Sequence, residues 1–383
     1  MIAVIAVSAL GIWVYLLVAR GGFWLGSERD AARPISLQNW PSVAAIIPAR
    51  NEADCIGATV SSLMAQDYRG RLTIFLVDDD SDDGTAEVAR NAASAAQDRH
   101  LLTVVTSPKV PPGWTGKLWA LKQGITAANA DGSFDYMLLI DADIVHKPDS
   151  VRWLVAQAEE RHLVLTSFMG KLRCTSLAER SHVPAFIFFF QMLFPFSWVN
   201  RPETPTAAAA GGCMLVRADD LRQAGGVDTI RGALIDDCAL ARTMKELGPI
   251  WLGLTERIHS IRPYENWRDV KQMISRSAYA QLGYSPWLLL ATTAGLALTF
   301  LAAPLLALLA EGPPRLIGIA TWALMALAFQ PTLRFYRLSP LWGVALPGIA
   351  LLYMSYTLES AYQYWVGRGG TWKGRAQANV SHQ

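Results

Sequence analysis

Charged residues are scarce in this sequence of 383 residues and make up only 17% of it, against roughly 25% in typical soluble proteins. Hydrophobic residues make up 52%, and 14 residues are Trp. This balance favours a membrane protein over a soluble one. The formal net charge is only +2, so the composition gives no argument for binding nucleic acid.

Cysteine is also rare. The four Cys residues are scattered, and neither a CxxC pair nor the Cys/His spacing of a zinc site occurs. We therefore expect reduced thiols in a cytoplasmic domain. The sequence has no internal repeats, coiled-coil heptads or low-complexity tracts.

A long apolar stretch lies near the beginning of the chain. Residues 2–19 carry no charge and are long enough to cross the hydrocarbon core of a membrane, so we expect an N-terminal transmembrane anchor at 1–20. No basic residue precedes this stretch, which argues against a cleavable signal peptide. Arg20, Arg29 and Arg33 follow it, and this charge bias places the next segment in the cytoplasm.

Three more apolar stretches, at 286–310, 316–333 and 341–365, predict a C-terminal transmembrane region at 286–365. The third contains Pro347, Gly348 and Glu359, so a broken or re-entrant segment is an alternative there. Three spans would put the basic tail at 366–383 outside the cell, whereas its positive charge favours the inside. The sequence leaves these two alternatives open.

Between the apolar ends, residues 40–280 are expected to form one α/β domain. Short runs rich in Val, Ile and Leu alternate with helical patterns. This alternation predicts a mostly parallel sheet with helices on both faces, and ligands of such sheets bind beyond the carboxyl ends of the strands. The expected strands are 43–48, 72–77, 101–106, 136–140 and 163–168, and the expected helices are 53–66, 85–96 and 148–160.

Residues 183–199 are apolar but are interrupted by Pro184, Gln191 and Pro195. We expect an interfacial segment whose six Phe and one Trp lie among lipid headgroups. A buried core helix is the alternative.

A first cluster of acidic residues follows the second expected strand. Asp78 and Asp79 stand at the strand end, and Asp80, Asp82 and Asp83 come directly after. Clustered carboxylates repel one another and raise each other's pKa, so a ligand with hydrogen-bond donors, such as a nucleobase and a ribose, would explain the first two. Asp82 or Asp83 could instead cap the helix that begins near Thr85.

A second acidic site, Asp141-Ala142-Asp143, follows the strand at 136–140. In extended structure this spacing puts both carboxylates on one side. Paired hard oxygen ligands suit Mg²⁺ or Mn²⁺, and such an ion would offset the charge of a leaving diphosphate.

A third acidic pair, Asp236-Asp237, opens a segment with helical spacing of apolar residues. The pair could simply favour the helix dipole. The small-residue run at 207–212, however, would let a backbone approach a ligand closely, and it precedes the pair in the sequence.

At these motifs the sequence resembles the inverting glycosyltransferase family 2, which has the GT-A fold. Residues 77–85 match the VDDxSxDGT element of that family, and Asp141 to Asp143 match its metal-binding DxD. Residues 116–124 resemble its GKxxALxxG element, and Asp237 resembles its catalytic base. The resemblance also implies that the nucleotide sugar contacts Pro48, Arg50, Glu52, Asp78, Asp79, Lys117, Asp141 and Arg276.

Further segments resemble the hopene-associated membrane glycosyltransferases of bacterial hopanoid gene clusters. These segments are 111–117, 188–191, 207–213, 233–238 and 367–375. Two departures from the wider family occur. It often has Glu-Asp where this chain has Asp236-Asp237, and the QxxRW motif of its processive members is replaced by a sequence that keeps Arg276 but has no Trp. The second departure argues against processive polymer synthesis.

The resemblance implies direct displacement on a nucleotide sugar, with a UDP-sugar as the expected donor. Asp143, supported by Asp141, would hold the Mg²⁺ or Mn²⁺, while Asp237, beside Asp236, would accept the proton of an acceptor hydroxyl. Lys117 and Arg276 would face phosphate charge, although they could instead be an exposed loop lysine and a residue flanking the next span.

The acceptor is expected to be a membrane lipid, such as a hopanoid or a glycolipid. Transfer to polyisoprenyl phosphate fits the membrane anchor equally well, and a non-catalytic membrane scaffold is the alternative from another class. We expect a multi-pass protein of the bacterial inner membrane with its α/β domain in the cytoplasm.

Overall fold

The computed structural model describes residues 1–30, 37–96, 100–367, 371–372 and 375–376. The chain divides into two compact units. The α/β unit contains Glu28–Leu172 and Trp198–Arg262, and the helical unit contains Met1–Ser27, Arg173–Ser197 and Pro263–Gly370. Arg33 and most of the basic tail lie outside the described residues.

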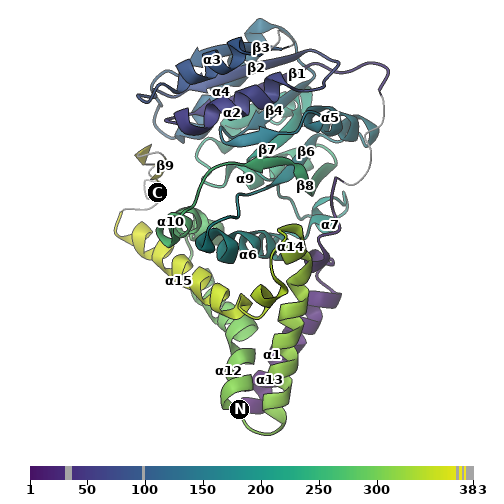
Figure 1. Cartoon of the computed structure of the whole chain (residues 1–383), viewed down its shortest axis with the longest axis vertical. Helices are drawn as coiled ribbons and strands as arrows, with labels where there is room; N and C mark the ends of the chain where they lie inside the picture. Colours follow the sequence, from purple (N-terminus) through teal and green to yellow (C-terminus); the bar gives the residue numbers. More distant parts are fainter. Residues whose placement is uncertain (31–36, 97–99, 368–370, 373–374, 377–383) are drawn as a thin grey trace. The chain divides into compact units, whose positions relative to one another are not determined.

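Eight strands of the α/β unit form one sheet in the order β3-β2-β1-β4-β7-β6-β8-β5 (Figure 1). Four of its neighbouring pairs are parallel and three are antiparallel. The strands are β1 (Val43–Ala49), β2 (Leu72–Asp78), β3 (Leu101–Thr106), β4 (Tyr136–Ile140), β5 (Ile144–His146), β6 (Leu165–Lys171), β7 (Cys213–Arg217) and β8 (Ile250–Ser260).

Helices cover both faces of this sheet. Alternate residues of a strand point to opposite sides, and every residue of β1 is buried, so both faces need a covering layer. Val43, Ala45 and Ile47 pack in one buried cluster with residues of α2 (Ala53–Met64), α3 (Thr85–Ser94) and α5 (Ser150–Glu160). On the opposite face lies α4 (Gly116–Asp131). Its Gly124 comes so near β1 that an added Cβ would lie 2.4 Å from Ile46 Cγ2. The remaining α-helices described in this unit are α8 (Ala218–Gln223) and α9 (Asp236–Lys245), and a 3-10 helix, η2, covers Gly226–Ile230.

The mostly parallel α/β sheet expected from the sequence is confirmed. Each of the five expected strands and three expected helices has a counterpart whose ends differ from the expected ones by no more than three residues. Four elements, α4, β5, β7 and β8, were not predicted from the sequence. The antiparallel strand β7 separates the two parallel parts of the sheet.

The helical unit has a core of its own. Trp13 of α1 (Ile2–Val18), Phe188 of α6 (Leu177–Leu193) and Phe329 belong to one buried cluster. The Ser176 hydroxyl and the Glu179 carboxylate form a capping box at the start of α6. The other α-helices of this unit are α10 (Trp267–Ala278), α11 (Pro286–Leu296), α12 (Ala302–Leu309), α13 (Pro313–Ala328), α14 (Gln330–Phe335) and α15 (Leu346–Trp365), while α7 (Phe196–Val199) lies at the sequence boundary between the units.

Two helical stretches in the described part of the chain are long and apolar enough to cross a membrane, Pro286–Leu309 and Pro313–Phe335. Ile2–Val18 is apolar but shorter. The third C-terminal stretch begins in a 3-10 helix, Pro340–Gly343, and continues as α15, which has Pro347 in its first turn, where a missing N–H is tolerated. Length and composition alone do not establish a span, so the transmembrane segments stay a prediction.

The expected domain at 40–280 is divided between the two units, and most of the segment expected at the membrane interface lies in the helical unit. Residues 173–197 belong to the helical unit, as does the segment Pro263–Gly370. The physical reason is packing, because Val183, Ala185 and Phe188 of α6 are fully buried, and the last two lie in the core cluster of the helical unit. The interfacial location of residues 183–199 stays a prediction.

Candidate active site

Several of the expected site residues follow the ends of neighbouring strands. Strands β2, β1 and β4 are parallel neighbours, so their carboxyl ends meet at one edge of the sheet. Asp78 ends β2, Arg50 follows β1 and Asp141 follows β4. Pro48 lies buried within β1, opposite Val77 of β2.

The turns after β1 and β2 are held together by hydrogen bonds. The Arg50 guanidinium donates to the backbone carbonyls of Asp79 and Asp80, and the Asp79 N–H donates to Ala49 O at 2.9 Å. Asn51 and Asp80 both adopt positive φ, at 51° and 59°, a conformation that Asn and Asp tolerate better than most residues. Arg50 therefore shapes this edge by binding backbone, and Asp79 beside it is only 1% exposed.

Two acids of the first cluster stabilise the local backbone. The Ser81 N–H donates to Asp78 Oδ1 at 3.2 Å. The Asp83 carboxylate accepts from the N–H groups of Ala53 and Thr85 and from the Thr85 hydroxyl. Burial acts to raise the pKa of Asp83, but these hydrogen bonds outweigh it and lower the pKa. Asp83 thus binds the N–H of the first residue of α3, although the N-cap residue of this helix is Gly84 and not Asp83.

The centre of the candidate site is a charge cluster built by three elements. Lys117, in the first turn of α4, places its Nζ 2.9 Å from Asp141 Oδ1 and 3.2 Å from Asp236 Oδ2 in the first turn of α9. Burial alone would lower the pKa of Lys117, but the carboxylates around it hold the pKa above its ordinary range. Burial raises the pKa of Asp141, against the opposing effect of Lys117.

Asp237 lies beside this cluster and has backbone donors on both oxygens. Gly211 N–H donates to Oδ2 at 2.9 Å, and Cys238 N–H donates to Oδ1 at 2.7 Å. A Cβ at Gly211 would lie 3.2 Å from Asp237 Oδ2 and 3.4 Å from Lys117 Nζ, so this position keeps the backbone close to both groups. Burial, followed by the charge of Asp236, raises the pKa of Asp237 to about 6.

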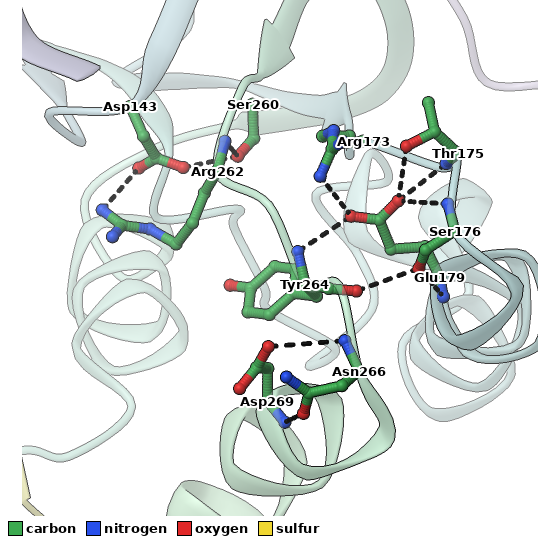
Figure 2. A network of polar contacts seen from close by, with 10 residues as sticks. All are labelled: Asp143, Arg173, Thr175, Ser176, Glu179, Ser260, Arg262, Tyr264, Asn266 and Asp269. Carbon is green, nitrogen blue, oxygen red and sulfur yellow. Dashed lines mark hydrogen bonds and ion pairs between the residues drawn. The ribbon is translucent and has the colours of Figure 1, made fainter. Parts of the chain in front are cut away.

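A second polar group surrounds Asp143 (Figure 2). The Ser260 hydroxyl at the end of β8 donates to Asp143 Oδ2, and Arg262 Nη2 lies 3.5 Å from Asp143 Oδ1. The same Nη2 donates to both carboxylate oxygens of Glu52 at 2.8 Å. Ser260 and Arg262 were not predicted from the sequence, because no motif marks them and β8 itself was not predicted.

The residues from Asp141 to Ile144 form a turn, which corrects the extended geometry expected from the sequence. Ile144 N–H donates to Asp141 O at 3.2 Å, and the Thr59 hydroxyl donates to Ala142 O at 2.8 Å. Asp141 therefore reaches Lys117, while Asp143 reaches Ser260 and Arg262. The charge of Asp143 still raises the pKa of Asp141, so the two carboxylates remain electrostatically close.

No group of three or more His, Cys, Asp or Glu side chains that could hold a metal ion occurs among the described residues. Two carboxylates are nevertheless a donor set that fits Mg²⁺ or Mn²⁺ when substrate phosphates complete the coordination. The geometry thus fits an ion shared with a diphosphate better than one held by the protein alone.

Arg276 lies on α10 of the helical unit. It is not part of either polar group of the α/β unit, and its role toward phosphate stays a prediction.

Comparison with known proteins agrees with this geometry. Residues 44–225 match the family model described as Glycosyl transferase family 2, so this domain resembles that family. A mannosyltransferase from Pyrobaculum calidifontis, solved in complex with GDP-Man and Mn²⁺, superposes with a TM-score of 0.57 at 19% identity and covers 94% of this chain and 99% of its own. This likeness shows a GT-A-like α/β fold.

Two curated relatives are both described as N-acetylglucosaminyltransferases. One, from Rhizobium leguminosarum bv. viciae, is 32% identical over 39% of this chain, and the other, from Mesorhizobium japonicum, is 30% identical over 38% of it. The matched part spans about a third of each relative, 32% of its length. Together, the domain and these relatives support a glycosyltransferase.

Proposed function

We propose that this protein transfers a sugar from a nucleotide-sugar donor to a membrane lipid, with inversion at the anomeric carbon. The observation that carries the proposal is the cluster of Lys117, Asp141 and Asp236 with Asp237 beside it. These residues come from separate segments of the chain, and the repulsion among the three carboxylates is offset in part by Lys117.

Asp237 is the proposed general base. A pKa raised to about 6 keeps this carboxylate ionised at neutral pH while making it a better proton acceptor than an ordinary Asp. The N–H groups of Gly211 and Cys238 fix the orientation of the carboxylate. Asp236 is paired with Lys117 instead, so the geometry favours Asp237 where sequence periodicity separated the two residues only weakly.

The donor side of the site is proposed to lie along the ends of β1, β2 and β4. Asp79, helped by Asp78, binds the nucleoside, and Glu52, Pro48 and Arg50 shape the turn beside it. Lys117 neutralises phosphate charge as a point charge. A Mg²⁺ or Mn²⁺ shared by Asp143, Asp141 and the diphosphate would offset the charge of the leaving group.

The proposed acceptor is a lipid because the helical unit presents an apolar surface. Val7 of α1, Leu308 of α12 and Leu316 of α13 are each 60% exposed or more. Contact of such a set of apolar side chains with water is energetically unfavourable. A hopanoid, a glycolipid and polyisoprenyl phosphate are all membrane lipids, so this apolar surface is compatible with each of them. We propose a membrane location with the α/β unit on the cytoplasmic side, on the basis of Arg20 and Arg29.

The test measures nucleotide release by the detergent-purified full chain. UDP-N-acetylglucosamine, UDP-glucose and GDP-mannose are offered with Mn²⁺ and with a hopanoid, a glycolipid or a polyisoprenyl phosphate. We expect release that depends on one lipid, a glycosylated product by mass spectrometry, and an inverted anomeric configuration by NMR. Absence of release with every pair, or full activity in excess EDTA, would contradict the proposal or its metal requirement respectively.

A further inference from the structure

The polar group around Asp143 contains a cation where the family resemblance leads one to expect a metal. Asp143 is 8% exposed and Glu52 is 6% exposed, and buried carboxylates need a counter-charge. Arg262 supplies it to both, since its Nη2 contacts Glu52 at 2.8 Å and Asp143 at 3.5 Å. The shorter contacts make Glu52 the stronger partner.

Backbone hydrogen bonds hold Asp143, Ser260 and Arg262 close together in the ligand-free protein. Strands β5 and β8 pair with Ile144 opposite Ser260, and Ile261 N–H donates to Asp143 O at 3.0 Å. The Ser260 hydroxyl binds Asp143 and also accepts from Arg262 N–H at 3.3 Å. On the other side, Glu52 N–H donates to the Thr85 hydroxyl at 2.8 Å. Arg262 is therefore held beside Asp143 by the edge of the sheet.

A divalent cation at Asp143 would meet this guanidinium at close range. Like charges at such a distance repel strongly at the partial burial of this site. The repulsion falls if the guanidinium withdraws toward Glu52, and it falls further if phosphate oxygens arrive together with the cation.

We propose that Arg262 is an internal counterion that competes with a divalent cation for Asp143, so that the cation binds well only together with the diphosphate of the donor. Arg262 is a positioning residue in this role, and Glu52 is the anchor on which it is retained. This inference rests on the proposed function in assigning Asp143 to the metal, but its test requires no turnover.

The experiment measures the affinity of the full-length, detergent-purified protein for Mn²⁺ alone, from the EPR signal of free Mn²⁺, and then repeats it with saturating UDP. Wild-type protein should bind Mn²⁺ weakly without UDP and much more tightly with it. Arg262→Gln should bind Mn²⁺ alone more tightly, by roughly tenfold, so the gain produced by UDP becomes smaller.

Matched variants separate this effect from structural damage. Arg257→Gln removes a nearby arginine that lies within β8 and pairs with Asp30 and Asp149, and it should leave the affinity for Mn²⁺ at the wild-type value. Arg262→Lys keeps the charge and should stay near wild type, which provides the comparison if Arg262→Gln fails to fold. If Arg262→Gln does not fold, the test relies on Arg262→Lys. A roughly tenfold rise in the affinity of Arg262→Lys for Mn²⁺, as expected for Arg262→Gln, would contradict the proposal.

Unchanged or weaker binding of Mn²⁺ by folded Arg262→Gln overturns the competition. The same conclusion follows if the tighter binding persists in Arg262→Gln combined with Asp143→Asn, because the cation would then bind elsewhere. Failure of the proposed function shows differently, as an absence of nucleotide release by wild-type protein whatever its affinity for Mn²⁺.

Discussion

Two acidic residues in the first turns of helices, Glu179 and Asp237, show how differently the surroundings of a carboxylate can shift its pKa. Glu179 of α6 in the helical unit is fully buried, and Figure 2 shows its carboxylate among donors from Thr175, Ser176 and Tyr264, with Arg173 beside it. Burial acts to raise the pKa of Glu179, but these hydrogen bonds outweigh it and lower the pKa.

Asp237 of α9 in the α/β unit has the opposite outcome. It also has backbone donors, from Gly211 and Cys238, yet burial and the neighbouring charge of Asp236 raise its pKa to about 6. Enough donors make a buried acid a structural anchor, whereas an acid forced against like charges is ready to accept a proton. The comparison therefore separates a structural carboxylate from a candidate base, and three experiments can break or sharpen it.

The largest difference should appear in turnover. Asp237→Asn keeps the size of the side chain and removes its basicity, so the turnover rate should fall by roughly two to four orders of magnitude while donor affinity stays nearly unchanged. Asp236→Asn should lose less, because Asp236 serves as a partner of Lys117. Glu179→Gln, measured on the folded fraction, should keep most of the wild-type rate.

This ordering can fail in two ways. Loss of turnover in Asp236→Asn with normal turnover in Asp237→Asn would reverse the assignment of the base. Normal turnover in both would remove α9 from the chemistry altogether.

The second difference concerns stability, because the two carboxylates affect the pH dependence of the free energy of unfolding in opposite directions. The pKa of Glu179 is lowered in the folded state, so its stabilising effect is present above its unfolded value, roughly 4.3, and is lost as the pH falls through the folded pKa. The pKa of Asp237 is raised to about 6, so its stabilising effect is present below its unfolded value, roughly 3.9, and is lost as the pH rises through about 6.

At pH 8, Glu179→Gln should therefore lower the free energy of unfolding by on the order of 2 kcal/mol, because hydrogen bonds to a charged group are lost. Asp237→Asn should leave this free energy unchanged or raise it. Thermal unfolding of the ligand-free variants in detergent checks both signs, and destabilisation of equal size in the two variants would show that Asp237 is structural as well.

The sequence predicted the first half of the sheet well, for a physical reason. Strands such as β1 and β4 are buried on both faces and read as continuous apolar runs, and each is followed by a helix or a motif. The second half gave a weaker signal. β7 begins directly after the small residues at 207–212, and β8 carries Glu256, Arg257 and His259 at its exposed end, so neither shows a clean pattern.

The same limit applies to the site. Lys117, Asp141, Asp236 and Asp237 could be named from motifs, but their pairing depends on how α4, β4 and α9 meet in space. Ser260 and Arg262 were missed because their contacts with Asp143 and Glu52 link positions more than 100 residues apart. No local pattern in a single sequence encodes such contacts.

The smallest effect should appear in the pH dependence of the reaction, and it tests whether Lys117 sets the basicity of Asp237. The pH dependence of kcat/KM reports the groups of the free enzyme, so the ligand-free geometry is the relevant one. With Asp237 as the base, kcat/KM should fall on the acid side with a midpoint near pH 6. Lys117 lowers the pKa of Asp237 by its positive charge, so Lys117→Met should move this midpoint to higher pH in addition to weakening donor binding.

Lys122→Met is the matched control, because Lys122 lies on the same helix but pairs with Asp228, outside the cluster. It should leave the midpoint where it is in the wild type. The comparison is made on kcat/KM for the same donor and lipid between pH 5 and pH 8. A midpoint that stays in place or moves to lower pH in Lys117→Met would mean that the group titrating near pH 6 does not sense Lys117, and Asp237 would then lose its claim to be that group.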